Sequence, residues 1–125
     1  MIDITKHVAY WRGGAVEDWE VARGLVDNGK PRHGLFFAHL ALEKALKALV
    51  CRSTGEIPPR IHDLVRLASL AGISVEEEGA SIWAEFNSFS LQGRYPDSVG
   101  PLPPGSVTQQ LMKRGDEVLT WLLTR

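Results

Sequence analysis

The side chains best suited to chemistry stand in an apolar stretch at residues 35–52. Glu43 and Lys47 are four positions apart there, with the acid on the N-terminal side. On a helix this spacing places both on one stripe, in the order that favours an ion pair between them. Because apolar residues flank the stripe, it also fits a groove in which Lys47 meets a phosphate or a partner's carboxylate. Both interpretations are open.

Two histidines belong to the same part of the chain. His39 borders an apolar face of the stretch, which is typical of a hydrogen-bonded core histidine. His62 and Asp63 open a short apolar segment directly after a Pro-Pro-Arg-Ile sequence, where either side chain can cap the first turn of a helix. Capping is the simpler interpretation, and His62 is kept as a weaker ligand-binding candidate.

A third group is the sequence Arg-Tyr-Pro-Asp at 94–97, which places a guanidinium, a phenol and a carboxylate within four residues. An arginine beside a stacking ring suits a phosphate and a base. Equally, Arg94 and Asp97 could pair and pin a crossing loop. The candidate ligand-binding residues are thus Lys47, Arg94, Tyr95, Asp97 and His62.

Metal and thiol chemistry find less support. His33 and His39 are six apart, so they point to different sides of a helix, and no Cys/His cluster exists. Cys51 has no base near it in sequence, which disfavours a thiol nucleophile. No glycine-rich phosphate loop is present. We expect no metal and no cofactor.

The elements that position these residues are predicted to be helices. Apolar residues recur at spacings of three and four between 8 and 26, and Asn28-Gly29 ends this pattern. A second helix is predicted over 31–51, with Lys44 facing away from its other charges onto solvated surface. A short third helix is predicted over 62–71.

A fourth helix is predicted to begin at Ser74, in a sequence that resembles a capping box, and Ser106 is predicted to cap a last helix. Residues 93–105 hold four of the seven prolines, which indicates a long non-helical crossing. No strand pattern appears. The predicted fold is all-α, an up-and-down bundle of four long helices and one short helix.

The chain as a whole is ordinary for a soluble protein. Its 125 residues fit a single domain at 1–125, and its net charge of −1 argues against coating nucleic acid while allowing a local basic patch. The single cysteine favours a reducing cytoplasm, and no run resembles a signal peptide or a membrane span. We therefore expect a cytoplasmic protein with no membrane partner.

Three sequence features together resemble the HEPN domain family (higher eukaryote and prokaryote nucleotide-binding). They are AHLALEKALKALV at 38–50, HDL at 62–64 and RYPD at 94–97, and the resemblance covers most of the chain. It implies a helical bundle that usually forms a homodimer. It also implies frequent pairing with a minimal nucleotidyltransferase, and roles in nucleotide binding, RNA cleavage and toxin–antitoxin pairing.

The family's best-known catalytic signature is an arginine followed by four to six residues and a histidine. In metal-independent RNA cleavage the histidine would move a proton and the arginine would stabilise charge on the phosphate. Arg94 is the matching arginine, but no histidine follows it. Arg32 and His39 have a permitted spacing in the wrong helix, which we interpret as coincidence.

These observations rank three functions. The first is a dimeric module that binds a nucleotide or RNA phosphate and acts with a minimal nucleotidyltransferase. The second is a non-catalytic interaction protein whose charged groove is filled by its own side chains or by a partner. The third is a metal-independent ribonuclease, which the missing histidine after Arg94 disfavours.

Overall fold

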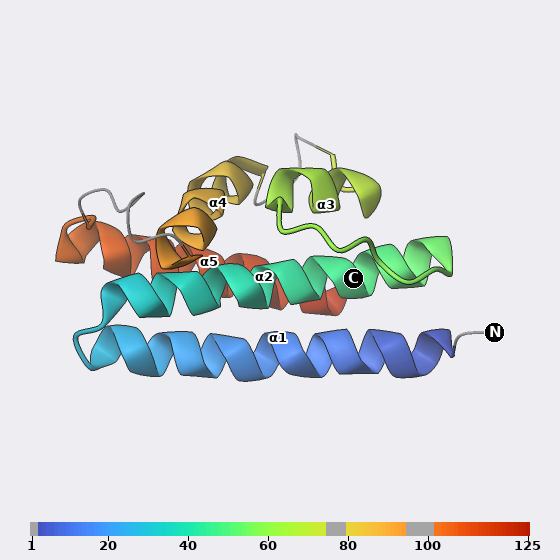
Figure 1. Ribbon diagram of the computed structural model, residues 1–125, viewed down its shortest axis with the longest axis horizontal. Coiled ribbons are helices and arrows are strands. Elements are labelled where there is room, and N and C mark those ends of the chain that lie inside the picture. Colours follow the sequence, from blue (N-terminus) through green and yellow to red (C-terminus); the bar gives the residue numbers. More distant parts are fainter. Residues whose placement is uncertain (1–2, 75–79, 95–101) are drawn as a thin grey trace.

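A computed structural model describes residues 3–74, 80–94 and 102–125, with the backbone alone at 80 and 91–94. The helices within these ranges are α1 (Ile4–Asp27), α2 (Pro31–Thr54), α3 (Leu64–Leu70), α4 (Ala80–Arg94) and α5 (Gly105–Thr124). The described ranges hold no strand, and the long helices alternate in direction along the molecule (Figure 1). The predicted all-α bundle of four long helices and one short helix is confirmed.

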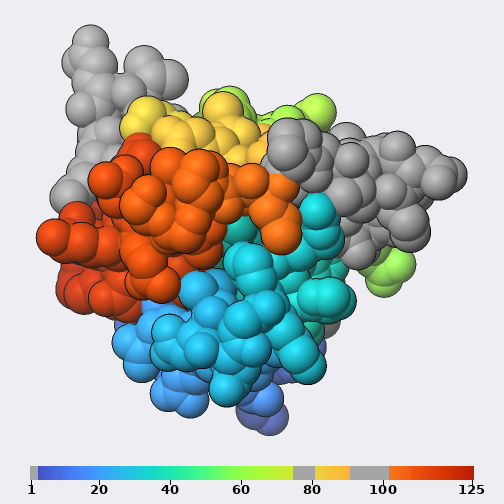
Figure 2. Space-filling view, turned by 90° about the vertical axis from the view of Figure 1, so that its left-hand side faces the viewer, coloured from blue at the N-terminus to red at the C-terminus, as the bar shows by residue number. Residues whose placement is uncertain are grey.

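Helix α2 is the centre of the bundle, because it contacts each of the other four helices. In Figure 1, α1 lies below it, α3 and α4 lie above it, and α5 lies behind it. Seen from the end that carries the α1–α2 turn, this turn lies below the N-terminal part of α5, with α4 on top (Figure 2). A helix that is apolar nearly all round needs such enclosure.

The first two helices form an antiparallel hairpin with a very close approach beside its turn. Gly29 occupies the left-handed region of the turn with a φ of 77°. One turn into α2, a Cβ atom added at Gly34 would lie 2.5 Å from a methyl carbon of Val26 and 2.9 Å from the carbonyl oxygen of Ala22. Only glycine therefore allows this spacing between the helices.

Helix α5 completes the core on the other side of α2. A Cβ atom at Gly115 would lie 2.6 Å from the Trp19 ring of α1, so the helix backbone rests directly on that ring. At its C-terminal end, Arg12 donates a hydrogen bond to the Leu123 carbonyl oxygen at 2.6 Å, and Arg52 donates one to the carbonyl oxygen of Arg125. Cations at the C-terminus of a helix satisfy its last carbonyls and its dipole.

Several predicted boundaries need correction. α2 continues three residues beyond Cys51 to Thr54, where Gly55 ends it in the left-handed conformation, and α3 is shorter than predicted because Asp63 is its cap. The last helix begins at Gly105 after Pro104, so Ser106 lies inside it and does not cap it. Ser74 is not helical, and 75–79 lie outside the described residues.

The predicted solvated position of Lys44 is also wrong. Its ammonium nitrogen lies 2.7 Å from a carboxylate oxygen of Asp18, and its side chain is only 27% exposed. Gly14 leaves room for this placement, because a Cβ atom there would lie 3.0 Å from the Lys44 side chain, closer than an ordinary contact. Lys44 therefore joins α2 to α1. Among the described residues, no helix is long and apolar enough to cross a membrane.

Candidate functional site

The charged residues singled out on α2 gather around one carboxylate, in a group that we call the Glu43 cluster: His39, Glu43, Lys47 and His62. Glu43 accepts a hydrogen bond from the Lys47 ammonium at 3.1 Å and one from His62 Nδ1 at 2.9 Å. Helix α2 supplies the first three side chains at intervals of four residues, which places them along one stripe. The connection between α2 and α3 supplies His62.

The two oppositely charged members of this cluster are nearly inaccessible to water. Glu43 is 5% exposed and Lys47 is 6% exposed. The Lys47 ammonium also lies 5.4 Å from the ring centroid of Trp11 in α1, within reach of a cation–π attraction. The predicted ion pair is confirmed. Because the pair is buried, Glu43 and Lys47 would have to separate before either could contact a ligand.

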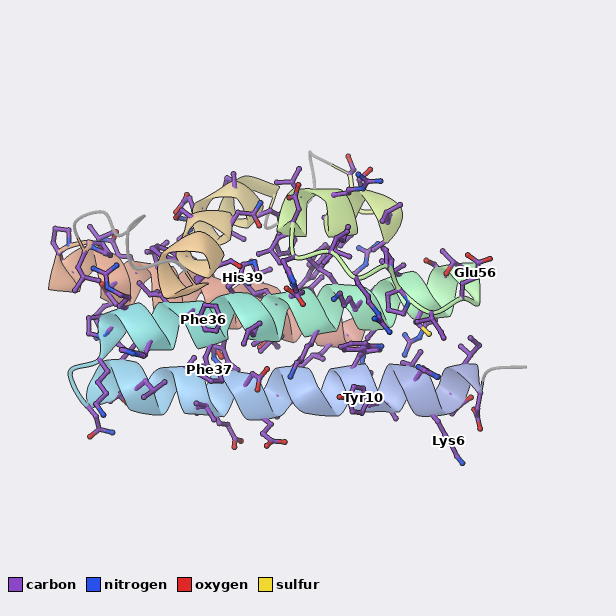
Figure 3. The ribbon with its side chains drawn as sticks, viewed as in Figure 1. Lys6, Tyr10, Phe36, Phe37, His39 and Glu56 are labelled. Atoms are coloured by element: carbon purple, nitrogen blue, oxygen red, sulfur yellow. The ribbon has the colours of Figure 1, made fainter. Side chains whose placement is uncertain are left out.

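His39 ties the cluster to the α2–α3 connection. Its side chain is fully buried, and its Nε2 lies 2.9 Å from the backbone carbonyl oxygen of His62. A carbonyl oxygen only accepts hydrogen bonds, so Nε2 carries a proton. Figure 3 shows the ring on the side of α2 that faces α3 and α4. The prediction of a hydrogen-bonded core histidine is confirmed.

His62 is the member of the cluster that reaches the surface, with 53% of its side chain exposed. Its Nδ1 donates to Glu43, which fixes the ring and leaves Nε2 as the other polar atom. No hydrogen bond from Nε2 is found within 3–74, 80–94 and 102–125. An imidazole oriented in this way can hold a proton or contact an anion at Nε2.

Asp63, the neighbour of His62, is the cap of α3. Its carboxylate accepts from the backbone amides of Val65 at 3.0 Å and Arg66 at 3.4 Å, as capping predicts. Asn87 of α4 donates to the same oxygen at 2.9 Å and accepts from the Leu64 amide at 2.8 Å. The sequence held no signal for this role of Asn87, which anchors the segment that carries His62.

The structure brings together two of the five predicted ligand-binding residues, Lys47 and His62. Arg94 is the last residue of α4, and its side chain is not among those described. Tyr95 and Asp97 lie outside the described residues. Across the described parts of the chain, no group of three or more His, Cys, Asp or Glu side chains is arranged to hold a metal ion.

Cys51 provides a test of the thiol chemistry considered above. Its side chain is fully buried, and burial raises the pKa of the thiol, since an apolar surrounding disfavours the thiolate. We expect iodoacetamide at neutral pH to label the folded protein far more slowly than the urea-unfolded protein, because the thiolate is the nucleophile. Mass spectrometry over time measures both rates. Equal rates would contradict this burial.

Comparison with known proteins gives one positive result. The family model described as HEPN domain matches residues 8–124. Comparison with curated proteins and comparison with solved structures each gave no match. The matched range includes all four members of the Glu43 cluster and the RYPD sequence.

Proposed function

The chain belongs to the HEPN domain family, and from this premise we propose that it binds a nucleotide or an RNA phosphate and acts with a minimal nucleotidyltransferase. The observation that carries the proposal is the extent of the family match, residues 8–124 of 125. Membership supports a helical module related to nucleotides or RNA. We further propose that the pairing is of the toxin–antitoxin kind. We also propose that the chain forms a homodimer, which is common among HEPN domains.

We assign the main ligand contacts to Arg94, Tyr95 and Asp97, and keep His62 and Lys47 as secondary candidates. Arg94 would hold the phosphate and Tyr95 would stack on the base. His62 suits an anion because Glu43 orients its ring while half of its side chain stays exposed. Lys47 is the weakest of these candidates, because its ammonium is buried and donates to Glu43, and it would have to leave that carboxylate to meet a phosphate.

Calorimetry with ATP, GTP and short RNAs tests this assignment. We expect the Arg94→Ala variant to bind about 10- to 150-fold more weakly, the loss typical of a charge-assisted hydrogen bond. Arg23→Ala is the matched control, because Arg23 is an exposed arginine on α1, and it should bind as the unsubstituted protein does. Absence of heat at millimolar ligand would rule out the small-nucleotide form of the proposal.

One observation favours the second candidate, a non-catalytic interaction protein. Glu43 and Lys47 are engaged by the protein's own side chains, since Lys47 contacts the Trp11 ring and Glu43 accepts from His62. Light scattering that shows a dimer, together with calorimetry that shows no ligand, would support this scaffold function. RNA cleavage in EDTA that Arg94→Ala abolishes would instead support a ribonuclease.

A further inference from the structure

A separate hollow lies near the N-terminal end of α1, where this helix faces the connection that leaves α2. Its volume is about 470 Å³, within the range of small-molecule sites. Lys6, His7, Tyr10 and Trp11 of α1 line it together with Ile57 of the connection. We call it the Tyr10 pocket.

The walls of the Tyr10 pocket are large apolar groups that the described residues leave uncovered. Tyr10 is 69% exposed and Ile57 is 57% exposed. The Tyr10 ring meets the Trp11 ring edge to face, with centroids 5.1 Å apart. Because Lys47 in turn contacts the Trp11 ring, this wall is held by the core beneath it.

Two of the side chains that line the pocket, Lys6 and His7, are basic, and none of the described residues that line it carries a carboxylate. Figure 3 shows Lys6 extending outward from α1, away from α2. A flat apolar wall with basic groups at its rim is complementary to a planar ring that carries an anionic group.

We propose that the Tyr10 pocket binds a nucleoside monophosphate, with the base against Tyr10 and Ile57 and the phosphate at Lys6 and His7. The class of ligand rests on the proposed function, since a nucleotide is the planar anion that such a module would handle. The location of the site is independent of the proposed function, because none of these five lining residues belongs to the ligand contacts assigned above. The chain would then hold a nucleotide at a second place, on α1.

The test is calorimetry with AMP, GMP, CMP and UMP on the full chain. Loss of one stacking ring should weaken binding by about five- to 150-fold in the Tyr10→Ala variant. Lys6→Glu should weaken binding of the nucleotide and leave the weaker binding of adenosine unchanged. The matched controls are Val21→Ala, which removes an exposed apolar side chain elsewhere on α1, and Lys113→Glu, which reverses an exposed lysine on α5. Both should bind as the unsubstituted protein does.

Three results would overturn the inference. One is mononucleotide binding that neither Tyr10→Ala nor Lys6→Glu weakens. Another is AMP binding no tighter than adenosine or indole-3-acetate. The third is no mononucleotide binding at millimolar concentration. If Arg94→Ala abolishes binding while Tyr10→Ala leaves it intact, the pocket fails and the proposed function stands. The reverse pattern supports the pocket and removes the assignment to Arg94.

Discussion

Replacing Glu43 by alanine is expected to lower the free energy of unfolding by about 3–5 kcal/mol, the cost of leaving one member of a buried ion pair alone. The Lys47 ammonium would lose the carboxylate that lies 3.1 Å from it, in a place where its side chain is 7% exposed. Aromatic contact with Trp11 would remain, but it does not replace a hydrogen-bonded counter-charge. Urea denaturation followed by circular dichroism measures the loss.

The control is the double variant Glu43→Leu with Lys47→Met, which removes both charges and keeps apolar volume. We expect it to recover most of the lost stability, since a buried ion pair is seldom better than a well-packed apolar pair. His62 loses its acceptor in both variants, but its half-exposed side chain can bond to water. If Glu43→Ala lowered the free energy of unfolding by less than about 1 kcal/mol, the pair of Glu43 and Lys47 would contribute no more than an exposed ion pair does.

Replacing Gly34 by alanine is expected to destabilise the hairpin by about 1–3 kcal/mol, the usual cost of overpacking. The added methyl group would meet the Ala22 carbonyl oxygen at 2.9 Å and the Val26 backbone nitrogen at 3.1 Å. Backbone atoms cannot rotate away as the end of a side chain can. The helices must therefore move apart, and the packing along both must change.

Gly13→Ala is the matched control, because a Cβ atom at this exposed position of α1 would meet nothing within 4 Å. There the substitution should raise the free energy of unfolding by up to about 1 kcal/mol, since alanine is the better helix former. The same change thus has opposite signs at two helical glycines. If urea denaturation showed that Gly34→Ala raises the free energy of unfolding, then α1 and α2 would lie farther apart at Gly34 than the structure places them.

The sequence predicted the helices well because their signals are local. Of the six apolar residues that recur at helical spacing in α1, four are buried and two, Trp11 and Val26, are partly buried. The buried ones are Val8, Ala15, Trp19 and Ala22. Boundaries were less accurate, since a helix end depends on which cap prevails. Pro104 precedes α5 without a side-chain cap, although Ser106 has the better capping chemistry.

The site was predicted less well because its contacts join distant residues. The pair of Glu43 and Lys47 follows from helical spacing, and the structure contains it. The bond between His62 and Glu43 spans 19 residues, and its formation depends on the path of a proline-containing connection that no local pattern specifies. Lys44 was misplaced for the same reason, since its partner Asp18 is on another helix.

The enclosure of α2 by four helices has a consequence for how the sequence can change. On α1 an exposed position such as Val16 or Val21 can accept many residues, because a large part of its side chain faces solvent. On α2 nearly every turn touches a neighbouring helix, so an exchange must suit a partner that is itself constrained. Divergence should therefore be slowest along this helix. A distant descendant of this chain would keep α2 recognisable after its other helices had lost their likeness.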